Sequence, residues 1–204
     1  MTYPHTTVKS LVKCNFCGQT HLKTKGKFVC PIEQILAPYM KKLIGAYMEN
    51  YLGKYVSCPY CHTTRLHVLG NHTPSLDLIC SNCRSSPVNI ECKSKCLSVS
   101  YLPKDIILPH GNYFDYLQRQ DQGLDFIVII YRVDRVTKVI SIRKVIFIPH
   151  DEIIKEDNFV VIQNDNSTLS TIFIRDHTLY KDITPQYHNM IDFSSKINKL
   201  IAAV

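Results

Sequence analysis

The stretch of residues 58–95 decides how this chain folds, and it reads CPYCHTTRLHVLGNHTPSLDLICSNCRSSPVNIECKSK. It holds two Cys-x-x-Cys pairs, Cys58/Cys61 and Cys80/Cys83, with 18 residues between them. Two thiolates at this spacing on a tight turn can reach one tetrahedral zinc ion at about 2.3 Å. The pattern is typical of a zinc ribbon. We therefore expect the four cysteines to share one structural zinc, which would hold the fold and take no part in catalysis.

Two strands of a hairpin are predicted within the same stretch, over residues 75–80 and 88–92, with the second cysteine pair at the tip. Asp77 lies in the first predicted strand. Glu91 and Lys93 are two positions apart at the end of the second. Side chains alternate between the faces of a strand, so Glu91 and Lys93 share one face. If the strands pair, Asp77 lies beside Glu91, and two carboxylates converge next to an ammonium group.

Two carboxylates and a lysine are the groups that metal-dependent phosphodiester cleavage needs. Mg²⁺ is a hard cation that binds carboxylate oxygens and keeps several of its waters. It can polarise a phosphate and lower the pKa of a bound water, and a neighbouring lysine can orient that water. From these residues alone the alternative is a surface hairpin with an ordinary ion pair, because an Asp…Glu-x-Lys pattern is short and common.

A longer pattern surrounds these residues. An N-x-x-P-x-x-D element over residues 71–77 leads into the second cysteine pair, and an E-x-K-S-K element over residues 91–95 follows it. In this order and spacing the stretch resembles the catalytic domain of DpnI-like and Dam-replacing restriction endonucleases, which belong to the PD-(D/E)XK nuclease superfamily. The resemblance covers residues 31–180 in outline. It implies an α/β fold, with a mixed sheet flanked by helices and an inserted zinc ribbon.

The resemblance also implies a function, namely restriction-type hydrolysis of DNA phosphodiester bonds by a Mg²⁺-dependent endonuclease. The residues carried over are Asp77 and Glu91 as ligands of the catalytic Mg²⁺, Lys93 as the catalytic lysine, and Cys58, Cys61, Cys80 and Cys83 as zinc ligands. A member of this family carries a C-terminal winged-helix domain that also reads methylated DNA, and we expect no such domain to fit in the 24 residues after Tyr180. Methylation dependence and target sequence are therefore left open.

A second metal site is suggested near the N-terminus, where Cys14 and Cys17 are followed by His21 and Cys30. The fourth ligand is open at this point, with His21, Cys96 or no further ligand as alternatives. We expect Cys92 and Cys96 to be buried small hydrophobic residues instead of ligands.

The rest of the chain divides around this core. Residues 31–52 carry apolar side chains at helical spacing and predict a helix. We expect a basic, cysteine-bearing segment over residues 1–30, a nuclease domain over 31–183 with its zinc ribbon at 58–83, and a tail or helix over 184–204. Three further side chains are considered for the site. We expect Lys95 to contact a phosphate, and we expect Glu49 to be a solvated surface glutamate instead of an additional acid of the site. Gln118 could face the site from its helix, but it is not favoured.

The charge distribution favours a polyanionic partner. Residues 1–104 carry 13 Lys/Arg and 4 Asp/Glu, whereas residues 105–204 carry 11 and 13. This asymmetry suits DNA, and double-stranded DNA is the expected substrate. A lysine-rich surface that serves only solubility would give the same count. Glycine-rich phosphate loops and dinucleotide fingerprints are absent from the sequence, which argues against nucleotide-driven enzymes of those classes.

Repeated Cys-x-x-Cys pairs without a signal peptide indicate the cytoplasm or another reducing compartment, and no apolar run is long enough for a membrane span. Two other functions fit the same residues: a non-catalytic zinc-ribbon protein that binds nucleic acid, or a nuclease that acts on RNA or branched DNA. The sequence does not determine the oligomeric state.

Overall fold

The computed structural model describes residues 10–23, 28–63, 65–69, 77–80, 82–83, 88–98 and 100–204. In chain order the elements are β1 (Ser10–Lys13), β2 (Thr20–Lys23), α1 (Pro31–Tyr55), β3 (His67–Val68), β4 (Leu78–Cys80), β5 (Val88–Cys96), β6 (Ile106–Asn112), α2 (Tyr113–Gln120), β7 (Asp125–Val133), β8 (Val139–Ile148), α3 (His150–Ile153), β9 (Phe159–Gln163), β10 (Leu169–Ile174), a short 3-10 helix (His177–Leu179), β11 (Lys181–Asp182), β12 (Met190–Asp192) and α4 (Ser194–Ala202).

The main sheet has the strand order β11-β8-β7-β5-β4-β3, and β12 also pairs with β8. Strands β5 and β7 run parallel, whereas β7–β8, β4–β5 and β3–β4 are antiparallel. Strand β7 is buried from Asp125 to Tyr131, so its apolar run has to be covered on both faces. Ile127 and Ile129 pack into one core, and Phe126 and Val128 pack into another.

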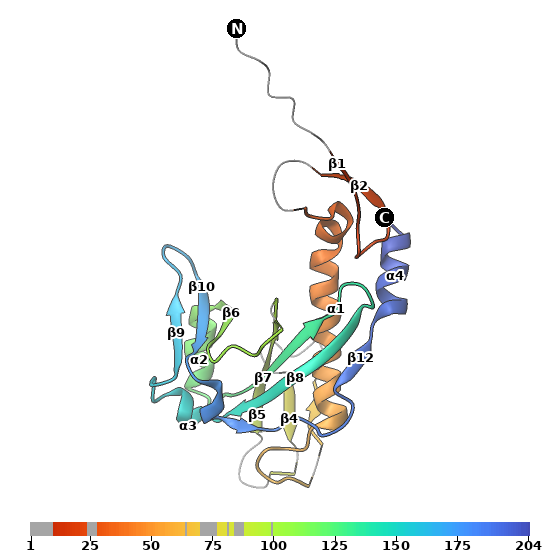
Figure 1. The fold of residues 1–204 in the computed structure, drawn as a ribbon. Coiled ribbons are helices and arrows are strands. Elements are labelled where there is room, and N and C mark those ends of the chain that lie inside the picture. The colour runs from red at the N-terminus through yellow and green to blue at the C-terminus, as the bar shows by residue number, and fades with distance from the viewer. Residues whose placement is uncertain are drawn as a thin grey trace.

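Helix α1 covers one face of the main sheet, and α4 lies beside it (Figure 1). The helix continues through Gly53, where an added Cβ would lie 2.8 Å from the Val68 side chain and 3.1 Å from the Leu66 carbonyl oxygen. The absence of a side chain at Gly53 therefore lets α1 pass close to β3. This approach brings the helix next to the segment that bears the ribbon cysteines.

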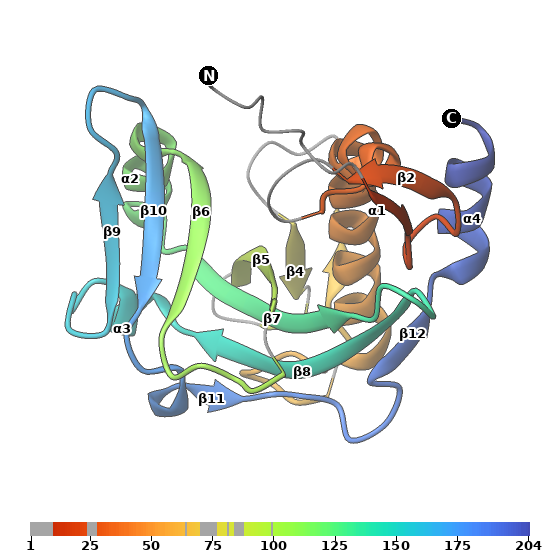
Figure 2. The same cartoon turned by 45° about the horizontal axis from the view of Figure 1, so that its top comes forward.

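The second core lies on the other face of the main sheet, under a smaller sheet of order β6-β10-β9 and helix α2. Figure 2 shows this small sheet and α2 on one side of β5 and β7, with α1 and the β1–β2 hairpin on the opposite side. Strand β5 contacts α1, and a side chain of α2 reaches it from the other side. The predicted α/β class, with a mixed sheet and flanking helices, is confirmed, and membership of a nuclease superfamily stays a prediction.

Several elements differ from the sequence expectations or were not foreseen. The helix predicted over residues 31–52 ends at Tyr55, and the strand predicted to end at residue 92 continues to Cys96. The expected first hairpin strand begins at Leu78 among the described residues, and residues 71–76 of the family-like pattern lie outside them. The segment after residue 184 contributes both a strand, β12, and a helix, α4. None of the described helices has the length and apolar character of a membrane span.

Candidate functional site

The four ribbon cysteines, Cys58, Cys61, Cys80 and Cys83, converge on one point, and we call them the ribbon cluster. Their ligand atoms all lie within 4.8 Å of one another. The Sγ–Sγ distances are 3.6 Å for Cys58–Cys83, 3.7 Å for Cys61–Cys80 and 3.6 Å for Cys80–Cys83. Four sulfurs placed tetrahedrally about 2.3 Å from a zinc ion would stand about 3.8 Å apart, whereas a disulfide needs about 2.05 Å. The cluster is therefore able to hold zinc, as predicted.

The ribbon cluster is tied to the main sheet by polar contacts around its first turn. The Tyr60 hydroxyl donates to the Asp125 carboxylate, with distances of 3.1 Å to Oδ1 and 3.0 Å to Oδ2, and the His150 amide donates to Oδ1 at 2.7 Å. The Lys181 ammonium donates to the Pro59 carbonyl at 2.8 Å. Burial raises the pKa of Asp125, and the hydrogen bonds from His150 and Tyr60 lower it in part. Because Asp125 begins β7, these bonds fix the ribbon against the centre of the main sheet.

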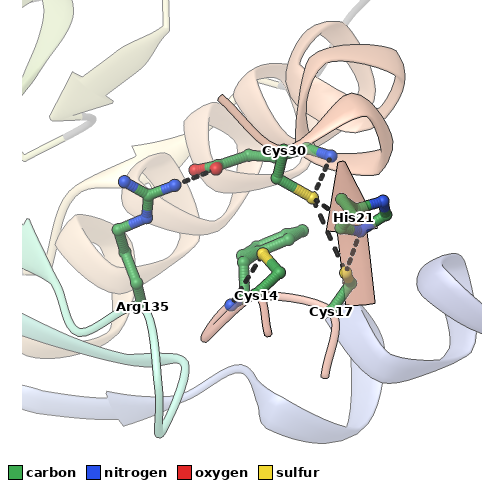
Figure 3. Close-up of polar contacts among 7 residues, drawn as sticks. Cys14, Cys17, His21, Cys30 and Arg135 are labelled. Carbon is green, nitrogen blue, oxygen red and sulfur yellow. Dashed lines mark hydrogen bonds and ion pairs between the residues drawn. The ribbon is translucent and has the colours of Figure 1, made fainter. Parts of the chain in front are cut away.

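A second group of ligand atoms gathers at the N-terminal hairpin, and we call Cys14, Cys17, His21 and Cys30 the N-terminal cluster. Their ligand atoms also lie within 4.8 Å of one another. Cys17 Sγ lies 3.1 Å from His21 Nε2 and 3.6 Å from Cys30 Sγ, as Figure 3 shows. Of the alternatives considered for a fourth ligand, His21 joins the cluster and Cys96 does not. This cluster is also able to hold zinc.

Local structure brings the N-terminal cluster together. Cys14 and Cys17 lie in the turn between β1 and β2, where Gly18 adopts a φ of 77°, a conformation that glycine tolerates best. Cys30 is the N-cap of α1, and its Sγ accepts a hydrogen bond from the Glu33 amide at 3.5 Å. The Glu33 carboxylate pairs with Arg135 from the turn between β7 and β8 (Figure 3). The cluster is thus joined to the start of one helix and to the main sheet.

The predicted carboxylate–lysine group also comes together, and we call Asp77, Glu91 and Lys93 the carboxylate site. Strands β4 and β5 pair antiparallel with Leu78 opposite Ile90, so Asp77 adjoins Glu91 at the end of this ladder. Asp77 Oδ2 accepts a hydrogen bond from the Cys92 amide at 2.7 Å and so extends the pairing beyond β4. The Lys93 ammonium binds Glu91 Oε1 on the same face of β5.

Glu91 is the most buried member of this site, with 5% of its surface exposed. Burial raises the pKa of its carboxyl group above the usual range; the charge of Lys93 opposes this shift and the charge of Asp77 adds to it. An acid is rarely this buried unless it is paired. The expectation of a plain surface ion pair is therefore not met, because such a pair would leave the carboxylate in water.

Glu49 on α1 belongs to the same neighbourhood, contrary to the expectation of a solvated surface glutamate. Its side chain is half-buried. Burial raises its pKa, the charges of Asp77 and Glu91 raise it further, and Lys93 opposes them. The sequence held a signal for this placement: Glu49 adjoins the buried Met48, so it stands at the border of the apolar face of α1.

Arg119 on α2 was missed by sequence reasoning. Its Nη1 lies 3.1 Å from Glu91 Oε2, and its side chain is 18% exposed. Gln118, the residue weighed from the sequence, is exposed. Tyr116 is the buried residue of α2, and three positions further on Arg119 returns to the same side of the helix. That spacing was the available signal.

The other residues considered from the sequence, Lys95, Cys92 and Cys96, differ in their burial. Lys95 is half-buried on β5, on the face that carries Lys93, and its role as a phosphate contact stays a prediction. Cys92 packs partly buried against the core under α1. The expectation that Cys96 is buried was wrong: it is exposed at the end of β5. Among the described residues, no third group of three metal-binding side chains converges as tightly as the two cysteine clusters.

Comparison with known proteins adds no assignment. No protein-family model matches the chain, and no curated protein matches it at a significant level. The chemistry of the two clusters and of the carboxylate site, together with the sequence pattern of residues 58–95, therefore indicates the function.

Proposed function

We propose that this protein is a Mg²⁺-dependent endonuclease that hydrolyses phosphodiester bonds of DNA and is stabilised by structural zinc. The observation that supports this most directly is the β4–β5 hairpin, which sets Asp77 beside a buried Glu91 with Lys93 on its carboxylate. The resemblance of residues 58–95 to DpnI-like and Dam-replacing endonucleases of the PD-(D/E)XK superfamily points to the same chemistry.

The donor set fits magnesium. Mg²⁺ is usually held by one or two carboxylates and otherwise by water and substrate oxygens. Asp77 uses Oδ2 for the Cys92 amide, and a carboxylate so bound can offer its other oxygen to a cation. Glu91 would be the second protein ligand, with Glu49 close enough to add negative charge. Bound there, Mg²⁺ would polarise the scissile phosphate and lower the pKa of a coordinated water.

The chain's own residues then have distinct tasks. Lys93 would orient the attacking water and offset charge that grows on the phosphate oxygens. In the reaction the water oxygen forms a bond to phosphorus while the bond from phosphorus to the 3′ oxygen breaks. One proton of the water passes to solvent, and the 3′ oxygen takes up a proton. The products would carry 5′-phosphate and 3′-hydroxyl ends, as in the resembling family.

DNA is the proposed substrate, because the half of the chain that carries the site is strongly basic.

The ribbon cluster would act on catalysis indirectly, through the strand that carries the site. Cys80 ends the strand that Asp77 precedes, so zinc bound by the ribbon would hold the hairpin that carries the site. A restriction-type role fits this chemistry.

The decisive experiment is cleavage of plasmid DNA by the zinc-loaded protein, with Mg²⁺ or with EDTA. We expect Mg²⁺-dependent cutting that falls by about 10³-fold in Lys93→Ala, because an oriented charge at the reacting phosphate is lost. Lys42→Ala, which changes an exposed lysine of α1, is the matched control and should cut like wild type. Fully methylated, hemimethylated and unmethylated plasmids test methylation dependence.

Failure to cut any duplex, with zinc bound and DNA retained, would favour a non-catalytic zinc-ribbon binding protein. Cutting of RNA or branched DNA alone would keep the chemistry and change the substrate.

A further inference from the structure

Glu91 is held by two cations at once. Lys93 binds Oε1, and Arg119 Nη1 lies 3.1 Å from Oε2. In this arrangement both carboxylate oxygens are engaged. The proposed function needs Glu91 as a metal ligand, and a divalent cation that approaches this carboxylate is repelled by both positive charges. Metal binding therefore favours the withdrawal of one of the two cations.

Arg119 is the cation whose withdrawal leaves the main sheet undisturbed, because it lies on α2 and not on a strand. Lys93 stands on β5 two residues from Glu91, on the same face of a central strand. Arg119 comes instead from the last turn of α2, 28 residues along the chain, on a long side chain that water still reaches. A guanidinium cannot lose its proton in a protein, so it can leave Glu91 only by moving.

The helix that carries Arg119 is fixed at both ends. The Asn112 side chain caps its start by accepting from the Phe114 amide at 3.0 Å. At its end Gln120 Oε1 lies 2.9 Å from His150 Nδ1. Tyr116 anchors the middle in the second core. The movement therefore involves the arginine side chain and leaves α2 in place.

The charges of the site indicate where the guanidinium goes. Asp77, Glu91 and the neighbouring Glu49 carry three negative charges when all are ionised, and Lys93 and Arg119 carry two positive ones. Binding of a divalent cation leaves an excess of positive charge, which an anionic phosphodiester offsets. Arginine matches phosphate oxygens in a two-pronged geometry that lysine lacks.

We propose that Arg119 is a catalytic residue that releases Glu91 on metal binding and then contacts a non-bridging oxygen of the scissile phosphodiester. This inference rests on the proposed function, and it adds a substrate-binding role for α2. Before metal binding the same side chain keeps the buried carboxylate paired. Arg119 thus exchanges one anion for another during each turnover.

Metal binding tests the first half of this exchange without any cleavage. We would titrate Mg²⁺ into the zinc-loaded full chain by calorimetry, without DNA. In Arg119→Gln, which keeps much of the side-chain volume and removes the charge, Mg²⁺ should bind about three- to tenfold more tightly, because a competing cation is gone. Arg119→Lys should bind as wild type does. Arg132→Ala, an exposed arginine of β7, is the control and should show no change.

Cleavage tests the second half. Arg119→Gln should lower kcat by about 10²-fold while KM changes by less than about threefold, since the contact strengthens in the transition state. Arg119→Lys should recover part of the rate. Zinc content and thermal unfolding of each variant establish that the fold is kept.

An unchanged or weaker Mg²⁺ affinity in Arg119→Gln would overturn the proposal whatever the cleavage result, because a merely structural ion pair predicts that outcome. A wild-type cleavage rate in the same variant would overturn it as well. Failure of the proposed function looks different: wild type and Lys93→Ala would then both fail to cut, and the phosphate contact would fall with it.

Discussion

The two cysteine clusters of this protein differ in what they are attached to. The ribbon cluster includes Cys80 at the end of β4, and its first turn is bound to Asp125 and Lys181. The N-terminal cluster lies between a two-stranded hairpin and the start of α1, with Cys30 as the helix N-cap. One cluster is therefore joined to the hairpin of the carboxylate site, and the other to the far end of a 25-residue helix.

This difference implies that loss of metal from the two clusters would affect the carboxylate site to different degrees. A helix of 25 residues is about 38 Å long at 1.5 Å per residue, and Glu49 stands in its last third. A structural change at Cys30 is separated from the carboxylate site by most of the length of α1. A disturbance at Cys80 has to cross only three residues to reach Asp77.

The largest expected effect comes from removing one ligand of each cluster. Cys61→Ser and Cys17→Ser change partly buried cysteines in equivalent positions of their knuckles. Each variant should lose one of two zinc ions per chain, measured by mass spectrometry of the metal. We expect Cys61→Ser to lower the cleavage rate by about 10²-fold, because the supports of a reacting site are disturbed, and Cys17→Ser to lower it by less than about threefold.

Cys96→Ser is the control for both variants, because Cys96 is exposed and belongs to neither cluster. It should keep two zinc ions and the full rate. Equal losses of cleavage in Cys61→Ser and Cys17→Ser would remove the distinction between the clusters.

A smaller effect is expected from the contact between the ribbon cluster and β7. Tyr60→Phe removes the hydroxyl that donates to both oxygens of Asp125 and leaves a buried carboxylate with fewer partners. The free energy of unfolding should fall by about 1–3 kcal/mol, measured by denaturant titration. Tyr39→Phe, on the exposed side of α1, should change it little. Retention of both zinc ions would show that the loss arises from the contact and not from the metal.

The parts of the site that could be predicted are those fixed by short-range spacing. Four cysteines in two Cys-x-x-Cys pairs, and Glu91 and Lys93 two apart on a strand, require only local geometry. The fourth ligand of the N-terminal cluster needed more, because it depends on how β1 and β2 pair. The register sets Val12 opposite His21, which brings the imidazole back over the turn that holds Cys14 and Cys17.

The parts that could not be predicted depend on packing between distant elements. Arg119 meets Glu91 across 28 residues, and the direction in which α2 faces is set by Tyr116 in the second core. Glu49 reaches the carboxylate site from α1, which packs against β5. The apolar periodicity of a helix predicts which of its faces is buried. It does not predict which polar side chains at the edge of that face will meet a residue of a distant strand.

The smallest expected effect comes from the ion pair between Glu33 and Arg135, although it joins residues 102 positions apart. The Arg135 side chain is 58% exposed, and exposed ion pairs contribute about 0–1 kcal/mol and are screened by salt. Arg135→Ala should therefore lower stability by less than about 1 kcal/mol in low salt and by less in high salt, with both zinc ions retained. Thermal unfolding at two salt concentrations measures this, and Arg143→Ala serves as the exposed control. A loss of zinc in Arg135→Ala would mean that the pair anchors the N-terminal cluster. The burial of Cys14, Phe16 and Cys30 in the core under α1 argues that packing anchors it instead.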